Sequence, residues 1–239
     1  MSGELVVKVS WGPRPESPEE LAVRWLAALV RLAELSAPEA VEWRWDTEDG
    51  KGGPVPSGTK EFALTVEAGG PEEDAEIIGW QAAVIGTWPD GGYAYLKAKG
   101  GGSDEYTPFT ATLQLFPAPG APAGTEPPLS GRLPEALAAL AETWGADTGL
   151  VYDRPLFNAI RSAFGLRNSQ PRCGWSTYLS ANRAALVPGD LPGARHTASG
   201  GGLVLDSGRS TEAVEAAQRV LADAGALESL PVSDPRPVW

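Results

Sequence analysis

The pattern of apolar and polar residues predicts a strand followed by a helix at the start of the chain. Apolar residues alternate with others in ELVVKVS (4–10), which is typical of a strand. In SPEELAVRWLAALVRLAEL (17–35), apolar residues recur at the three- and four-residue spacing of an amphipathic helix. Ser17 and Glu20 form a capping-box pattern at its start, and Pro38 is expected to end it.

The middle of the chain predicts an antiparallel meander. Residues 77–88 (IIGWQAAVIGTW), 93–99 (YAYLKAK) and 109–116 (FTATLQLF) are expected to form three strands, with a turn at Pro89–Gly92 between the first two. The short run FALTV (62–66) is ambiguous. Its period-two alternation favours a strand, whereas the polar residues before it would also cap a short helix.

Helices and strands alternate in the second half of the chain. The expected helices are 133–145, 154–164 and 210–225, and the expected strands are 148–153, 174–180 and 201–208. A strand, a helix, a run of strands and then this alternation predict an α+β fold: a mainly antiparallel β-sheet with helices packed against it.

The length and composition fit one large domain or two small ones, and we expect a single domain, residues 1–239, with a proline-rich loop at 117–131. That stretch holds five prolines and three glycines, so it cannot be a helix or a central strand. A hydrophobic content of 42% is enough for a proper core. No apolar run reaches membrane-spanning length, the start of the sequence lacks the pattern of a secretion signal, and a single cysteine excludes an internal disulfide. A cytoplasmic protein is the simplest interpretation.

The charge is concentrated in the first half of the chain. The net charge is −12. Residues 1–130 carry 20 acids and 9 bases, a net −11, and residues 131–239 carry 11 acids and 10 bases, a net −1. An acidic surface repels nucleic acid and anionic membranes, because both present phosphate. It favours either a basic protein partner or simple solubility.

The lone cysteine and the lone histidine do not form a convincing catalytic pair. Cys173 precedes the expected strand GWSTYLS, whereas the nucleophile of papain-type enzymes begins a helix. His196 lies in the turn-rich segment LPGARHTASGGG, where a surface role is the more ordinary one. We expect both to be structural, so that substituting either leaves function intact. One His and one Cys also cannot form a Cys/His zinc site.

Other catalytic patterns are missing from the sequence. The acidic stretch EEDAE lacks the spacing of an EF-hand, and the G-x-S-x-G motif of serine hydrolases does not occur. The glycine runs at 100–102 and 200–202 match neither of the two phosphate-binding patterns. We expect these glycine runs to be turns beside strands. Glu16 is expected to favour the helix dipole or to pair with Arg14. We therefore expect no catalytic residue, no metal and no cofactor. Any of the nine tryptophans left exposed would be a candidate anchor for a protein partner.

Three segments resemble the immunity protein 52 family of bacterial polymorphic toxin systems. They are Trp11-Gly12-x-Arg14-x-Glu16 before the first helix, the helix and strand in LPEALAALAETWGADTGLV, and Gly174-Trp175-x-Thr177-Tyr178-Leu179-Ser180. Their order along the chain makes the resemblance more specific than any one of them, and it covers roughly residues 5–207. The acidic GGPEEDAE loop and the proline-rich stretch are not part of this resemblance.

The resemblance implies an immunity protein that binds and neutralises a toxin encoded beside it, usually one with a restriction-endonuclease fold. It also implies a cytoplasmic location, where a delivered nuclease would act. Charge density alone leads us to expect a basic nuclease domain to bind a group of acids in the first half: Glu72, Glu73, Asp74, Glu76, Asp104 and Glu105. A small carboxylate- or metal-dependent enzyme is the alternative, and a scaffold without a toxin partner is a third possibility.

Overall fold

Most of the predicted strands and helices are present in the computed structural model, which describes residues 4–47, 52–71, 73–106, 109–189 and 191–229. The chain divides into two units. Unit 1 comprises Met1–Leu5 and Gly12–Arg132, and unit 2 comprises Val6–Trp11 and Leu133–Trp239. Neighbouring strands in both units pair antiparallel, so the predicted α+β class is confirmed.

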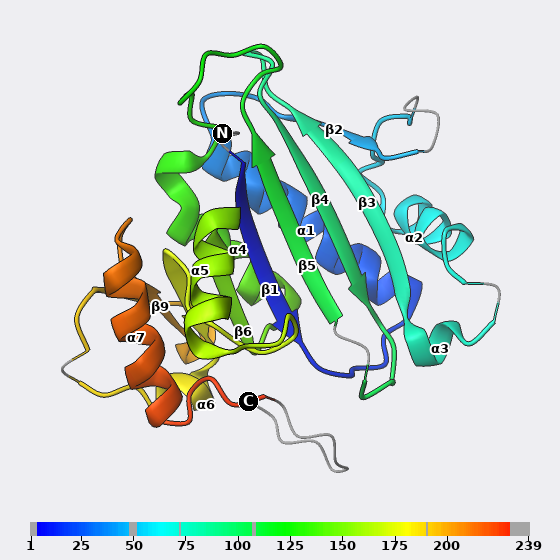
Figure 1. Ribbon diagram of the computed structural model, residues 1–239. Helices are drawn as coiled ribbons and strands as arrows, with labels where there is room; N and C mark the ends of the chain where they lie inside the picture. The colour runs from blue at the N-terminus through cyan, green and yellow to red at the C-terminus, as the bar shows by residue number, and fades with distance from the viewer. Residues whose placement is uncertain (1–3, 48–51, 72, 107–108, 190, 230–239) are drawn as a thin grey trace. The chain divides into compact units, whose positions relative to one another are not determined.

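Unit 1 contains four strands of the nine-stranded sheet, with helices on one face of them. The strands lie in the order β2-β3-β4-β5, and Figure 1 shows α1 crossing behind β3, β4 and β5. Its elements are α1 (Pro18–Ser36), β2 (Glu42–Trp45), α2 (Thr59–Ala68), α3 (Ala75–Ile78), β3 (Trp80–Thr87), β4 (Tyr93–Gly100), β5 (Phe109–Phe116) and the 3₁₀ turn Ser130–Arg132. Residues 117–129 contain no helix or strand, and the last two residues of the expected loop belong to the 3₁₀ turn.

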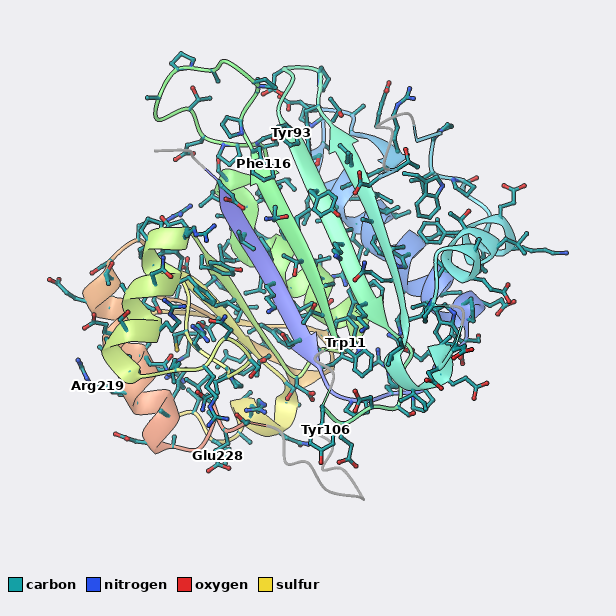
Figure 2. All side chains as sticks on the ribbon, turned by 45° about the vertical axis from the view of Figure 1, so that its right-hand side comes forward. Trp11, Tyr93, Tyr106, Phe116, Arg219 and Glu228 are labelled. Atoms are coloured by element: carbon teal, nitrogen blue, oxygen red, sulfur yellow. The ribbon has the colours of Figure 1, made fainter. Side chains whose placement is uncertain are left out.

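The alternation along the strands decides which face of this sheet is buried. On β5, every second residue from Phe109 to Leu115 is buried, and the residues between them are half-buried. The aromatic ring of Phe62 on α2 lies 5.8 Å from Trp25 on α1, between ring centroids, so the two helices share the apolar side of the unit. On the other face Tyr93 and Phe116 stack across β4 and β5 with centroids 4.7 Å apart (Figure 2).

The start of α1 has the predicted capping box. The Glu20 backbone N–H donates to Ser17 Oγ over 3.2 Å, and the Ser17 N–H donates to the Glu20 carboxylate over 2.8 Å. Two of the backbone donors that a helix start leaves without partners are thereby satisfied. The helix ends at Ser36, just before Pro38, as expected.

Two expectations for unit 1 are corrected or decided by the structure. The strand predicted at 77–88 begins only at Trp80, because Ile77 and Ile78 belong to the short helix α3 and Gly79 breaks the chain direction with a φ of 79°. The ambiguous run 62–66 is helical, within α2. The edge strand β2 has the sequence EWRW and was not predicted from the pattern of residues.

Unit 2 contains five strands of the nine-stranded sheet, in the order β1-β6-β7-β9-β8. Its elements are β1 (Leu5–Trp11, of which Leu5 belongs to unit 1), α4 (Leu133–Trp144), β6 (Thr148–Tyr152), α5 (Arg154–Phe164), β7 (Ser176–Leu179), α6 (Ala181–Ala184), β8 (Ala194–Thr197), the 3₁₀ turn Ser199–Gly201, β9 (Leu203–Asp206) and α7 (Thr211–Asp223). The three helices predicted for this half are present within one or two residues of their expected ends.

Two of the segments that carry the family resemblance, and Trp11 from the third, belong to unit 2. Trp11 at the end of β1 stacks on Trp144 at the end of α4, with ring centroids 5.1 Å apart and planes at 12°. Both side chains are buried. Such a pair contributes about 1 kcal/mol beyond the burial of its area. These tryptophans are therefore structural, as their places on apolar faces predicted.

Gly174 is required by a close approach between neighbouring strands. The Trp175 N–H donates to the Val151 carbonyl over 2.7 Å, and the Gly174 N–H donates to Thr177 Oγ1 over 3.1 Å. A Cβ atom added at position 174 would lie 2.1 Å from the Val151 carbonyl oxygen. The glycine of the Gly-Trp-Ser-Thr segment is therefore a packing requirement of the sheet.

We predict that Gly174→Ala destabilises the protein by about 2–4 kcal/mol, because the backbone of β6 must move to admit the methyl group. Urea denaturation measures the change. Gly189→Ala is the matched control, since nothing lies within 4 Å of a Cβ at that position. Equal stability of the two variants would contradict this account of Gly174.

Candidate functional site

Two acidic segments that are distant in the sequence meet at one end of unit 1. One is α3 with the residues before it, and the other is the loop between β4 and β5. The Ser103 N–H and its hydroxyl both donate to the Glu76 carbonyl, over 3.0 and 3.1 Å. The Asp104 N–H donates to the Ile77 carbonyl over 2.9 Å. The acids predicted from charge density thus come together from both segments on one surface.

The predicted site residues on this surface are largely open to solvent. Glu73, Asp74, Glu76 and Glu105 are exposed, and Asp104 is half-buried. Glu72, the sixth predicted residue, lies outside the described residues. We call the group of Glu73, Asp74, Glu76, Asp104 and Glu105 the acidic surface.

Two large apolar side chains share this surface and were missed by sequence reasoning. Ile77 on α3 is 48% exposed, and Tyr106 in the β4–β5 loop is 81% exposed. Figure 2 labels Tyr106 at the lower edge of the molecule. The sequence signal was present but weak: each residue directly follows a predicted acid.

The Trp-Gly-Pro-Arg-Pro-Glu segment braces the β4–β5 loop through its backbone. The Arg14 N–H donates to the Gly102 carbonyl over 3.0 Å, and the Glu16 N–H donates to the Gly101 carbonyl over 3.2 Å. Pro15 forms an isolated parallel bridge with Gly101. Gly100 is the last residue of β4 and Gly101 forms the bridge, so the glycine run ends the strand and leads toward the turn at 105–106. It lies between the helix start and the acidic surface.

Glu16 is the buried centre of an ion-pair triad. Its side chain is 7% exposed, and its two oxygens lie 2.9 Å from Arg14 Nε and 2.6 Å from Arg24 Nε. The predicted pairing with Arg14 is confirmed, and Arg24 on α1 is an additional partner. The triad ties the segment before α1 to the first turns of the helix. It offers no proton-transfer chemistry, because both partners of the carboxylate are guanidinium groups.

The structure does not bring the lone cysteine and histidine into a catalytic arrangement. Cys173 is buried, its N–H donates to Gln218 Oε1 over 2.8 Å, and burial raises the pKa of its thiol from 9.0 to about 12. A nucleophilic cysteine needs the opposite shift. His196 lies on the exposed strand β8 rather than in a loop, which corrects the expectation, and β9 separates β8 from β7 in the sheet.

Within the described part of the chain, no cluster of three or more His, Cys, Asp and Glu side chains is arranged to hold a metal ion. Among the same residues, no helix has the length and apolar character needed to cross a membrane. The residues of the acidic surface lie on α3, on the residues before it and on the β4–β5 loop, and all but Asp104 are exposed.

Comparison with known proteins supports the fold. No known protein-family model matches the sequence, and no curated protein is significantly similar to it. A solved structure described as the Pseudomonas aeruginosa T6SS protein PA0821 is similar, with a TM-score of 0.50 and 13% sequence identity. The match covers 98% of this chain and 78% of that protein. The likeness concerns the fold, and membership of the immunity protein 52 family stays a prediction.

We predict that Glu16→Gln destabilises the protein by about 1–3 kcal/mol, because two arginines lose the charge that compensates them in a partly buried site. Chemical denaturation measures this loss. Glu19→Gln, an exposed acid in the first turn of α1, is the control and should change stability by only a few tenths of a kcal/mol. If the two variants lose equally little stability, the ion-pair triad does not stabilise the segment before α1.

We predict that the Cys173 thiol of the native protein does not react with a thiol reagent at mildly alkaline pH and reacts readily in concentrated guanidinium chloride. Since its folded pKa is raised, the unfolded chain ionises first. The associated stability is complete below the ordinary pKa of 9.0 and is lost as the pH rises toward about 12. The stability difference between the protein and Cys173→Ala should shrink over that range. A difference independent of pH would contradict the assigned burial.

Proposed function

We propose that this chain is an immunity protein that binds one molecule of a toxin domain and blocks it without catalysis. The observation that carries the proposal is the acidic surface, because five of the six acids selected by charge density lie on two segments joined by backbone hydrogen bonds. Its proposed partner is a basic nuclease domain of a polymorphic toxin system, encoded beside this chain. The acidic surface would lie against the cationic groove with which a nuclease holds nucleic acid.

The charge of the acidic surface affects how fast a partner of opposite charge binds. Opposite potentials accelerate diffusional encounter, and this effect is strong at low salt and weak at high salt. The net charge of −11 on residues 1–130 acts over the whole half, and the acidic surface adds a local concentration of carboxylates. Because those carboxylates are already exposed, little desolvation opposes encounter until the two surfaces touch.

Two independent similarities favour a toxin-system role. The first is the resemblance of the ordered segments around Glu16, Trp144 and Gly174 to the immunity protein 52 family. The second is the shared fold with a protein described as a T6SS protein, at a sequence identity too low to transfer a function by itself. A cytoplasmic location follows from the proposal, because a nuclease toxin would act there.

The chemistry of the described residues favours binding over turnover. The one thiol is buried and protonated, the buried carboxylate of Glu16 is held between two arginines, and the clustered carboxylates are exposed. A carboxylate enzyme instead holds a pair of acids with different environments in a recess. These features argue against the alternative of a small carboxylate- or metal-dependent enzyme.

Co-expression with the adjacent toxin domain tests the proposal directly. We expect growth to be rescued and a one-to-one complex to be recovered. Toxin released from that complex by denaturation and refolding should regain activity, because inhibition by binding leaves it chemically intact. Rescue by substoichiometric amounts of this chain, with toxin that stays inactive after separation, would instead indicate an enzyme. No rescue and no complex would contradict the proposal.

We predict that the triple variant Glu73→Lys, Glu76→Lys and Glu105→Lys lowers the association rate about tenfold or more at low salt and flattens its salt dependence. Asp74 is left unchanged because its φ of 59° disfavours most other side chains. Stopped-flow mixing with catalytically inactive toxin measures both quantities.

The matched control is Glu212→Lys, Asp223→Lys and Glu228→Lys, which makes the same change in net charge at exposed positions of unit 2. It should slow association much less, since the acidic surface itself keeps all its carboxylates. Equal effects of the two triple variants would show that overall charge, and not the acidic surface, guides the encounter.

A further inference from the structure

The exposed apolar side chains of the described residues gather in the acidic half of the chain. Among the large ones, Leu186 belongs to unit 2, and the other five belong to unit 1: Val23, Val30, Leu64, Ile77 and Tyr106. Tyr106 is the most exposed of all, at 81%. An aromatic ring held almost wholly in water is costly in the free protein and becomes favourable once a partner covers it.

We infer that Tyr106, supported by Ile77, is the anchoring contact of the acidic surface, and that its partner is a protein surface with an apolar recess bordered by Arg and Lys side chains. This inference rests on the proposed function, since it specifies how the same surface would hold its partner. It adds apolar anchors to a surface that was predicted from charge alone.

The backbone around Tyr106 is held in place before binding. The Tyr106 N–H donates to Asp104 Oδ1 over 3.0 Å, and the Asp104 N–H donates to the Ile77 carbonyl over 2.9 Å. The chain of contacts therefore runs from the aromatic residue through an acid to α3. A loop fixed in this way loses less conformational entropy on binding than a free loop.

The placement of acids around the two apolar side chains specifies the chemistry of the partner. Asp104 and Glu105 directly precede Tyr106, and Glu76 directly precedes Ile77. A central apolar contact with a charged rim is the usual anatomy of a protein interface. A guanidinium group of the partner would be able to pair with a rim carboxylate and to lie on the face of the Tyr106 ring.

The same acids argue against the other common partners of an exposed tyrosine. The phosphates of single-stranded nucleic acid and of an anionic membrane would lie next to Glu76, Asp104 and Glu105, and like charges repel. The acids and the apolar side chains together therefore favour a cationic protein surface.

Substitutions of the apolar anchors, Tyr106 and Ile77, should change a different rate constant from substitutions of the acids around them. Long-range attraction by the acids acts before contact and sets the association rate. Burial of the Tyr106 ring occurs only after contact, so it sets the lifetime of the complex. Substituting the anchors should therefore raise the dissociation rate and leave the association rate and its salt dependence nearly unchanged.

Kinetics with catalytically inactive toxin domain from the adjacent gene tests the inference in the full chain. We expect Tyr106→Ala to raise the dissociation rate about thirtyfold, in the range of an interface hot spot, and Ile77→Ala to raise it about fivefold. The association rate should stay within about twofold in both. Leu186→Ala, which removes an exposed apolar side chain from unit 2, is the control and should change neither rate.

Misfolding would not mimic this result, because truncating a side chain that is 81% exposed leaves no cavity. Urea denaturation of Tyr106→Ala should give the midpoint of the unsubstituted protein. If the unsubstituted protein forms a complex, and Tyr106→Ala forms the same complex with an unchanged dissociation rate, the inference is overturned and the proposed function stands. Absence of any complex with the unsubstituted protein would overturn the proposed function, and the inference with it.

Discussion

Backbone hydrogen bonds to the turn after β4 hold the surface of unit 1 together. Three segments meet there: residues 14–16 before α1, α3 with its flanking residues, and the turn itself. The approach is so close that side chains would prevent it. A Cβ at Gly102 would lie 2.4 Å from the Ile77 carbonyl oxygen, and Gly101 has a φ of 84°. Two adjacent glycines thus let three polar segments share their backbone groups.

This constraint explains how one protein keeps so many acids without losing stability. Where a carboxylate is buried, at Glu16, two arginines compensate it. On the acidic surface, four of the five residues are exposed, and water and dissolved salt screen the repulsion between their carboxylates. The backbone contacts hold together the two segments that carry the acidic surface. The residues of the ion-pair triad and those of the acidic surface are therefore different side chains of the same unit.

Local patterns were enough to predict the elements whose signals are local. The capping box at Ser17, the apolar stripe of α4 and the alternation of β5 all depend on residues within a few positions of each other, and each is present as predicted. The family resemblance pointed to Glu16 and Gly174 as notable residues. Their physical roles, an ion triad and a close strand approach, appeared only once their distant partners were in place.

The features that sequence reasoning missed depend on tertiary context. Ile77 and Ile78 continue the apolar run of β3 in the sequence, but Gly79 turns the chain and leaves them in α3. His196 lies in a turn-rich segment, yet pairing with β9 makes that segment a strand. The acids were selected by charge density alone. That residues 76 and 104 lie on joined segments was not deducible, because two of the three joining bonds are between backbones and the sequence does not say which distant carbonyl a backbone N–H will meet.

Hydrogen–deuterium exchange of the chain, alone and with inactive toxin domain from the adjacent gene, tests the central claim that unit 1 binds its partner through the acidic surface. The account predicts slower exchange in peptides that cover residues 73–79 and 101–106 when the partner is present, with the strands of unit 2 unchanged. Protection confined to unit 2, for example at the exposed edge strand β8, with unchanged exchange in those two segments, would contradict it.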